Sequence, residues 1–209
     1  VYPAVAIDLN GRAITIEGET STDGAPAVTL DGQQSASVLI CQSGEGSATI
    51  FRHLLLINGT ANNGGGAAIS GGSSPYFENC VFANHSATQG GGGIYIDRSA
   101  PTFVNCIVRD NSATRGGGVY CIDNSNPRFE NCRIASNQGG VDGGGCYALL
   151  SSNPTFLGCE FTSNVVSGGQ FAFGGVLYNR DGSNPELTNC VFRDNQATAV
   201  FSSGGAIAN

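Results

Sequence analysis

The chain has 209 residues, which is long enough for one substantial hydrophobic core or for one elongated solenoid. Its 32 glycines argue against a helical bundle, and because they show no three-residue period they argue against collagen as well. The formal net charge of -7 disfavours nucleic acid as a partner, and no apolar run approaches the roughly 18 residues that a membrane-spanning helix needs.

Residues 1–48 are expected to form two irregular leading coils, Ala6 to Glu17 and Ala27 to Cys41. A regular repeat follows in residues 49–209, where Phe51 and Leu54 stand 26 residues before Phe77 and Cys80. With no linker between the two parts, residues 1–209 are predicted to form a single domain.

The regular part repeats about every 26 residues. Its cysteines are 26, 26, 27 and 31 residues apart, with a proline five residues before each and an apolar residue three residues before. Five residues after each cysteine comes Asn or His, and then glycines and a short apolar run. The cysteines are Cys80, Cys106, Cys132, Cys159 and Cys190, and the apolar column is Phe51, Phe77, Phe103, Phe129, Phe156 and Leu187.

Each repeat is interpreted as one coil of three short strands. Asparagine suits the left-handed turn after the first strand, and glycine suits the turn before the third. No coil can bury its own apolar face, so about seven coils must stack roughly 4.8 Å apart, with the cysteines and phenylalanines as inward ladders. Truncation of Phe129 is then expected to cost far more stability than truncation of Tyr2, ahead of the first coil.

Several motifs carry a family resemblance: Asp8-Leu-Asn-Gly-Arg-Ala-Ile-Thr-Ile16, Leu30-Asp-Gly-Gln33, Cys41-Gln-Ser-Gly-Glu45 and the repeated Asn-Cys-x-Phe-x-x-Asn with Gly-Gly-Gly. The chain resembles bacterial right-handed parallel β-helix repeat proteins of the pectin-lyase-like superfamily. The leading motifs resemble secreted planctomycete-type repeat proteins, and the later repeat resembles chlamydial polymorphic outer-membrane proteins. The resemblance implies an all-β, single-stranded right-handed β-helix that is secreted or on the cell surface of a bacterium. It implies little about activity.

Relatives of this kind usually place an amphipathic helix before the first coil. No helical pattern precedes Asp8 here, and Gly204 to Asn209 follows a third strand without a capping segment. Both ends are therefore expected to be open. Identical chains stacking end to end, or the neighbouring coils of a longer chain, would cover them.

No catalytic motif is recognisable. Hydrolysis on this fold would need paired carboxylates, and elimination would need a basic residue beside a calcium cluster, yet the chain has no Asp-Asp pair and no lysine. Asp110, Asp142 and Asp194 are interpreted as solvated turn residues, and His53 and His85 as turn residues standing in for asparagine. No catalytic residue, metal or cofactor is expected.

The third strands offer a candidate binding surface. If Ile94 and Ile96 face inward, Tyr95, Tyr120 and Tyr147 face outward on three successive coils and could contact a polysaccharide. The alternative is a structural stack that shields the sheet.

Two chemical modifications are also considered. The ladder cysteines point the same way, which favours buried thiols over disulfides, although Cys121 and Cys146 on adjacent strands could form a pair. Asn58 and Asn84 begin N-glycosylation sequons at predicted turns.

The interpretation favoured by these patterns is a non-enzymatic extracellular structural solenoid, a surface scaffold or adhesin-like module that could stack into a filament. The alternatives are a carbohydrate-binding module and a polysaccharide lyase or hydrolase.

Overall fold

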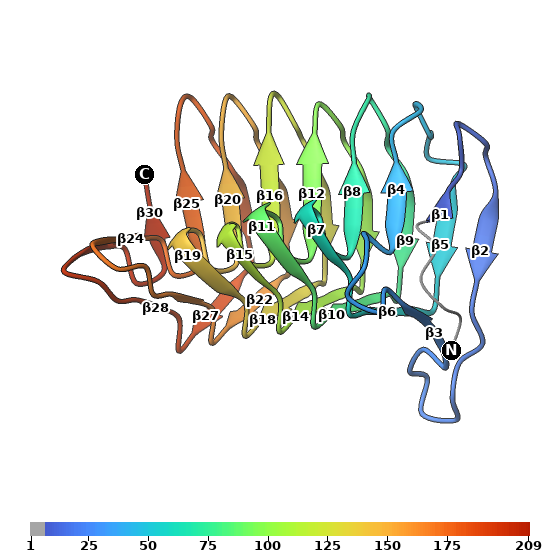
Figure 1. The fold of residues 1–209 in the computed structure, drawn as a ribbon, viewed down its shortest axis with the longest axis horizontal. Coiled ribbons are helices and arrows are strands. Elements are labelled where there is room, and N and C mark those ends of the chain that lie inside the picture. Colours follow the sequence, from blue (N-terminus) through green and yellow to red (C-terminus); the bar gives the residue numbers. More distant parts are fainter. Residues whose placement is uncertain (1–6) are drawn as a thin grey trace.

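The computed structural model describes residues 7–209, so Ala6 and Tyr2 lie outside the described residues. Within that range the chain winds as an elongated parallel β-solenoid, with its coils side by side along the long axis (Figure 1). No helix in residues 7–209 is long and apolar enough to cross a membrane.

Each regular coil passes through four parallel sheets in turn, named here sheets 1 to 4. Sheet 1 contains β1 (Ile7–Asp8), β4 (Leu39–Cys41), β8 (Ala67–Ile69), β12 (Ile94–Asp97), β16 (Val119–Ile122), β20 (Cys146–Ala148), β25 (Leu177–Asn179) and β30 (Ile207–Ala208). Sheet 2 contains β2 (Thr15–Glu17), β5 (Ile50–Arg52), β9 (Tyr76–Glu78), β13 (Thr102–Val104), β17 (Arg128–Glu130), β21 (Thr155–Leu157) and β26 (Glu186–Thr188). Sheet 3 contains β3 (Val28–Asp31), β6 (Leu54–Ile57), β10 (Val81–Ala83), β14 (Ile107–Arg109), β18 (Arg133–Ala135), β22 (Glu160–Thr162) and β27 (Val191–Arg193). Sheet 4 contains β7 (Thr60–Asn63), β11 (Ser86–Gly90), β15 (Ser112–Arg115), β19 (Gln138–Asp142), β23 (Val165–Val166) and β28 (Gln196–Ala197), with β24 (Phe171–Phe173) and β29 (Phe201–Ser203) beside it.

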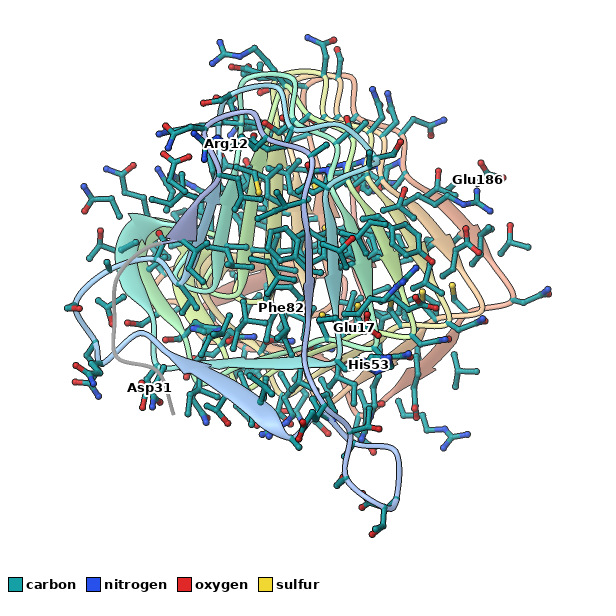
Figure 2. All side chains as sticks on the ribbon, turned by 90° about the vertical axis from the view of Figure 1, so that its right-hand side faces the viewer. Arg12, Glu17, Asp31, His53, Phe82 and Glu186 are labelled. Atoms are coloured by element: carbon teal, nitrogen blue, oxygen red, sulfur yellow. The ribbon has the colours of Figure 1, made fainter. Side chains whose placement is uncertain are left out.

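The core consists of columns of identical or similar side chains, as predicted. Neighbouring rings of the phenylalanine column are parallel, with centroids 4.8 Å apart for Phe51 and Phe77 and 4.7 Å apart for Phe103 and Phe129. Leu187 ends this column and is only partly buried. Strand alternation turns one apolar face of every strand toward this column, so the core fills the centre of the solenoid (Figure 2).

Left-handed residues turn the chain at the predicted places. Asn79 and Asn105 both have φ of 52° between sheets 2 and 3, and Gly158 takes the same place with φ of 62°. The bend between sheet 4 and sheet 1 holds glycine because a side chain has no room there. A Cβ on Gly116, whose φ is 59°, would lie 2.2 Å from the carbonyl oxygen of Val119.

The structure adds a fourth strand to the three predicted for each coil. This strand belongs to sheet 4 and holds sequences such as Ser86-Ala-Thr88, in which only a small alanine faces inward. Such a segment has the period of a strand but very little of the hydrophobicity by which strands are recognised.

The leading coil is irregular, as expected. It has strands in sheets 1, 2 and 3 but none in sheet 4, and residues 18–27 leave the coil as a projecting excursion closed by an antiparallel bridge between Thr20 and Pro26 (Figure 1). At the opposite end, β24 and β29 pair with each other in the two longest coils.

Candidate functional site

The outer face of sheet 4 is polar and mostly uncharged. Ala87 and Ala113 point inward from it and are only 7% and 8% exposed. The outward side chains between them and beside them are in register from coil to coil. The register column is Thr60, Ser86, Ser112 and Gln138. Beside it, hydrogen bonds join Asn62, Thr88 and Thr114 from coil to coil.

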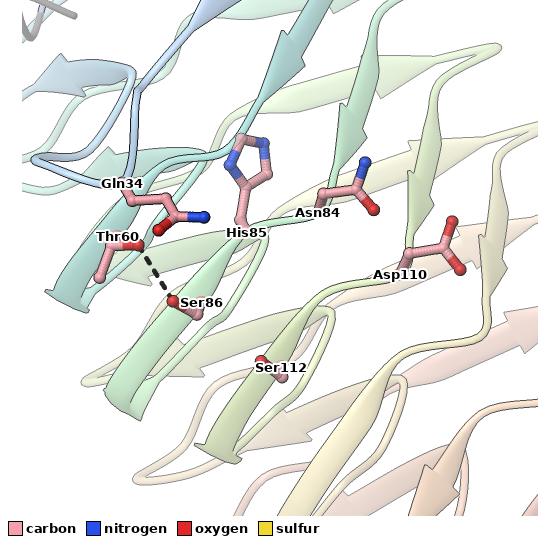
Figure 3. Close-up of a pocket in the computed structure, with 7 residues that line it drawn as sticks. All are labelled: Gln34, Thr60, Asn84, His85, Ser86, Asp110 and Ser112. Carbon is pink, nitrogen blue, oxygen red and sulfur yellow. Dashed lines mark hydrogen bonds between the residues drawn. The ribbon is translucent and has the colours of Figure 1, made fainter.

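A hollow of about 490 Å³ lies where sheet 3 turns into sheet 4 (Figure 3). The Oγ1 atom of Thr60 and the Oγ atom of Ser86 are hydrogen-bonded at 3.1 Å across it. Its one carboxylate, on Asp110, is 2.5 Å from the guanidinium of Arg109. The hollow is lined by Gln34, Thr60, Asn84, His85, Ser86, Asp110 and Ser112. A single carboxylate does not provide the pair that glycoside hydrolysis requires.

Two further hollows continue this surface toward sheet 1. One of about 470 Å³ shares Ser112 with the first and extends to Gln138. The other, of about 230 Å³, shares Thr88 and Thr114 with its neighbour. Its walls are Asn63, Thr88, Gln89, Tyr95, Thr114, Arg115, Tyr120 and Ile122. Only this third hollow combines aromatic rings with hydroxyl, amide and guanidinium groups.

The tyrosines of sheet 1 do face outward, since Ile94 and Ile96 are fully buried in the core. Their rings form a continuous stack along the solenoid. The centroids of Tyr120 and Tyr147 are 5.1 Å apart at 23°, whereas those of Tyr95 and Tyr120 are 5.6 Å apart at 72°. The stack is therefore parallel toward the C-terminus and turns edge-to-face at Tyr95.

The prediction of an exposed stripe is wrong for Tyr120 and Tyr147. Tyr120 is 8% exposed and Tyr147 is 1% exposed, because the ends of the sheet 4 strands fold over them. A Cβ placed on Gly90 would lie only 2.0 Å from Cδ1 of Tyr120. Burial also raises the pKa of Tyr147 to about 12. Of the three tyrosines predicted to form the stripe, Tyr95 alone is half-buried.

The family assignment rests on this coil architecture and on one sequence comparison. The family model described as the right-handed beta helix region matches residues 4–168. The chain belongs to the right-handed β-helix family. No curated protein and no solved structure matches the chain.

In this β-helix protein the predicted turn histidines occupy two different environments. His53 lies at a left-handed turn with φ of 53°, in the place of Asn79. His85 is 1% exposed, and its Nδ1 atom accepts a hydrogen bond of 2.8 Å from the backbone N–H of Gly59. Burial lowers the pKa of His85 to about 4. Both residues stand in for asparagine, as predicted, but His85 is a core residue.

The three aspartates that were predicted to be solvated turn residues also occupy different environments. Asp110 and Asp194 are exposed turn residues, with φ of 57° and 55°. Asp142 is 6% exposed, and its Oδ2 atom accepts a hydrogen bond of 3.2 Å from Nε of Arg115. Burial raises the pKa of Asp142, although Arg115 opposes this. The interpretation of Asp142 as solvated is wrong. Among residues 7–209 no group of three His, Cys, Asp or Glu side chains is arranged to hold a metal ion.

Two polar ladders inside the β-helix were not predicted. In the first, Asn111 donates from Nδ2 to the carbonyl of Phe82 at 3.1 Å and to Oδ1 of Asn137 at 3.0 Å, and the pattern continues through Asn164 to Asn195. In the second, buried serines bond from coil to coil, as when the Ser99 N–H donates to Oγ of Ser125. The recurrence of Asn and Ser at the repeat spacing was the signal available for both.

A residue of a different type lies at or next to the start of each polar ladder. His85 begins the asparagine ladder, and its N–H donates to Oδ1 of Asn111 at 2.9 Å. Glu45 contacts Ser73, which stands 26 residues before Ser99, the first serine of the ladder. Glu45 is fully buried and accepts hydrogen bonds from Oγ of Ser73 at 2.8 Å and from the N–H groups of Gly11 and Ser43.

All eight cysteines of the β-helix lie in the described residues, and all are free thiols there. Seven are buried and Cys190 is half-buried. Within the ladder each sulfur donates to carbonyls, as Cys80 does to Phe51 at 3.5 Å. Cys121 and Cys146 lie on adjacent strands, but Cys146 stands opposite Val119 in register.

The two sequons of the β-helix differ in accessibility. Asn84 is exposed at a left-handed turn with φ of 59°. Asn58 is half-buried, and its Nδ2 atom donates to Oδ1 of Asp31 at 3.1 Å. The nitrogen that a glycan would modify is therefore engaged at Asn58.

Proposed function

We propose that this β-helix is a non-enzymatic structural module outside the cell, a surface scaffold or adhesin-like unit that extends by joining its ends to those of a second copy. The observation that carries this proposal is the position of its partly buried apolar side chains. Ile7, Ile16 and Val28 lie in the first coil, and Leu187, Cys190 and Phe192 lie in the last. They are the terminal members of the internal columns.

The columns of two stacked copies would match. Ile16 begins the column that Leu187 ends, and Leu30 begins the column that Phe192 ends. Ile7 and Ile207 stand at the two ends of sheet 1. A second copy placed one coil spacing beyond the first would bring apolar residues onto apolar residues in each column, removing their exposed area from water.

Backbone pairing favours the same contact. Among the described strands, β26 and β27 at the C-terminal end each have a partner on one side only. Such edges readily pair with another chain. Ile207 is 38% exposed and Phe201 is 58% exposed at this end. The contact joins two different surfaces and does not close, so it generates a filament.

The extracellular assignment is supported by the resemblance to secreted repeat proteins, and the burial of seven of the eight thiols is compatible with an oxidising environment. Burial raises the pKa of Cys106 well above its usual value, which keeps the thiol protonated and slow to oxidise. The net charge of -7 opposes sideways clumping while leaving the ends free to join.

Sedimentation and electron microscopy of the purified chain test the assembly. We expect concentration-dependent rods at micromolar concentration that Leu187→Asp and Phe192→Asp abolish. Val191→Asp is the matched control, because Val191 precedes Phe192 on β27 but is 42% exposed and points outward. A wild-type chain that stays monomeric would overturn stacking, and fast amide exchange in β26 would then point to the next coil of a longer chain as the partner.

The proposal that the module is non-enzymatic is tested separately. Incubation with acidic and neutral polysaccharides should give no new reducing ends and no unsaturated products. Appearance of either product, at a rate proportional to protein concentration, would establish a lyase or hydrolase instead.

A further inference from the structure

Two segments beside sheet 4 in the last two coils form an uncharged arm. The arm consists of residues 167–173 and 198–203, whose strands β24 and β29 pair with each other in parallel. Residues 161–179 and 195–209 contain no charged side chain. The arm extends past the last strand of sheet 1 along the long axis of the solenoid (Figure 1). It therefore lies where the next copy would begin in an end-to-end stack.

The arm exposes apolar side chains at its edge. Val200 is 76% exposed, Phe201 is 58% exposed and Phe171 is 45% exposed. The rings of Phe171 and Phe201 stack with centroids 5.7 Å apart, and Phe173 holds the arm to the tyrosine column by stacking on Tyr178 at 5.2 Å. Strand β29 has β24 as its one partner strand among the described residues. An exposed apolar patch on an unpaired strand edge marks a contact with another chain.

The opposite end of sheet 4 has a gap in its leading coil. The Thr60 N–H donates to the carbonyl of Ala36 at 3.1 Å, and the Val38 N–H donates to the carbonyl of Gly65 at 3.2 Å. A single residue of the leading coil thus spans what the next coil covers with residues 61–64. Strand β7, which holds most of that segment, has β11 as its one partner strand in residues 7–209. The other edge of β7 is therefore open beside the gap.

We propose that the arm of one copy adds a strand to this open edge in the next copy, with β29 lying parallel to β7. The inference rests on the proposed end-to-end stacking, and it identifies the part of the second copy that the arm contacts. In such a stack one empty strand position, roughly 4.8 Å wide, separates the last coil from β7 of the next copy. The arm already extends in this direction, so β29 can fill that position as an added strand.

Charge and side-chain size are compatible with this pairing. Residues 32–44 and 54–77, which surround the gap, contain no charged side chain, so the uncharged arm meets no repulsion there although the chain has a net charge of -7. The small residue Ala36 borders the gap beside Ala61. Ala61 is half-buried, whereas its register partner Ala87 is only 7% exposed. A strand added at the gap would cover Ala61 as the other inward alanines of sheet 4 are covered.

A proline tests the open edge. Alternate residues of a parallel strand direct their N–H groups to the same side, so the Asn62 N–H faces the gap as the Thr60 N–H does. Asn62→Pro removes that donor, and an edge strand tolerates the change. We expect it to raise the concentration at which rods form roughly tenfold, because one short strand loses backbone hydrogen bonds. Asn62→Ala is the matched control, because it loses the same side-chain bond from Thr88 but keeps the N–H, and it should assemble as the wild type does.

Cross-linking tests the contact without a proline. Ser202→Cys on the arm and Asn62→Cys on β7 are placed in separate chains, which are mixed and oxidised with copper–phenanthroline. We expect a disulfide-linked pair of the two chains, which neither variant forms with the wild type. Arg128→Cys, at an exposed position on the outer face of sheet 2, replaces Asn62→Cys in the control mixture and should give no link.

The outcomes separate the arm contact from the proposed stacking. Rods that form equally from Asn62→Pro and Asn62→Ala, without the disulfide in the cysteine mixture, would overturn the arm contact and leave stacking intact. Loss of rods in Phe192→Asp with the disulfide retained would support both, since the arm then holds chains whose columns no longer match. A chain that forms neither rods nor the disulfide would overturn both. Protection of the β7 amides from exchange in a dilute monomer would show that the same chain covers this edge, and it would overturn the arm contact alone.

Discussion

The imidazole of His85 caps the backbone of the preceding coil: its Nδ1 atom accepts the Gly59 N–H at 2.8 Å. The asparagines that continue the ladder accept the same backbone bond through Oδ1, as Asn111 does from His85. In addition they donate from Nδ2 to a carbonyl of the preceding coil. The Nε2 atom of His85 is buried and has no hydrogen-bond partner among the described residues. The neutral imidazole is therefore required, but it satisfies the ladder less fully than asparagine does.

Acid should destabilise the fold through this residue. The pKa of His85 is lowered by burial to about 4, from an ordinary value of 6.5, so the unfolded chain binds more protons between these pH values. Stability contributed by the neutral ring is complete above pH 6.5 and is lost as the pH falls toward 4. The loss reaches about 3 kcal/mol, from the shift and the usual cost per pKa unit. Denaturant unfolding between pH 7 and 4 measures it.

The variant His85→Asn should remove this pH dependence, because its Oδ1 could accept from Gly59 and its Nδ2 could donate to Leu56. We expect equal or greater stability at pH 7 and a flatter profile toward pH 4. His53→Asn, which retains His85, serves as the control and should keep the acid-side loss. An unchanged profile in His85→Asn would contradict this assignment.

The columns were predictable because residues of the same kind recur in the sequence at the spacing of the repeat. Phe77 and Phe103 are 26 residues apart, and one coil of that length places them directly over each other. The strands of sheet 4 were not predictable by the same means. Their inward residues are small, as at Ala87, and their outward residues resemble those of a loop.

The candidate site was predicted only in part. The outward direction of the tyrosines follows from the alternation around Ile94 and Ile96. Whether each tyrosine ring is buried depends on which side chain of sheet 4 lies opposite it. The alternation of residues along one strand gives the direction of a side chain but not its neighbours on another sheet. The absence of a side chain at Gly90 lets the Tyr120 ring pack against the end of its strand, and Asp142 is buried near Tyr147. Glu45 lies before the regular repeat, so no column indicated its role.

Phe129→Ala should be among the most damaging single substitutions. The ring is fully buried and lies between Phe103, with centroids 4.7 Å apart, and Phe156, with centroids 5.0 Å apart. Its removal leaves a cavity in a column that cannot collapse, at a cost of about 3–5 kcal/mol. Leu187→Ala at the end of the column should cost clearly less, and Arg128→Ala on the outer face of the same strand as Phe129 less again. Equal losses in the three variants would refute the column assignment.

Glu45→Gln should destabilise the junction between the leading coils and the serine ladder. Burial alone would raise the pKa of Glu45, but the hydrogen bonds from Gly11, Ser73 and Ser43 outweigh it and lower the pKa. An amide replaces one acceptor oxygen by a donor that faces other donors, at a cost of roughly 1–3 kcal/mol. Thermal unfolding at pH 7 should show the loss.

Because the pKa of Glu45 is lower in the folded chain, its contribution is present above the unfolded pKa and is lost as the pH falls through the folded one. The wild type and Glu45→Gln should therefore converge in strongly acidic solution. Glu17→Gln, at an exposed position in the leading coil, is the control and should match the wild type throughout. A gap between wild type and Glu45→Gln that persists in acid would contradict the role of the carboxylate.

Thiol reactivity should separate one cysteine from the other seven. Cys190 is half-buried in the last coil, whereas Cys106 is fully buried and its pKa is raised well above the ordinary value by burial. Alkylation requires the thiolate and access to it, so a native sample should lose one thiol quickly and the rest only as fast as the chain unfolds. Mass spectrometry after timed iodoacetamide treatment counts them. In denaturant all eight should react, and a lower count without reductant would reveal a disulfide, with Cys121 and Cys146 the first pair to examine.

If chains stack end to end, assembly should also slow alkylation of Cys190, because Val28 of the next copy would then cover it. Phe192→Asp, which blocks stacking, should restore the fast rate at high concentration.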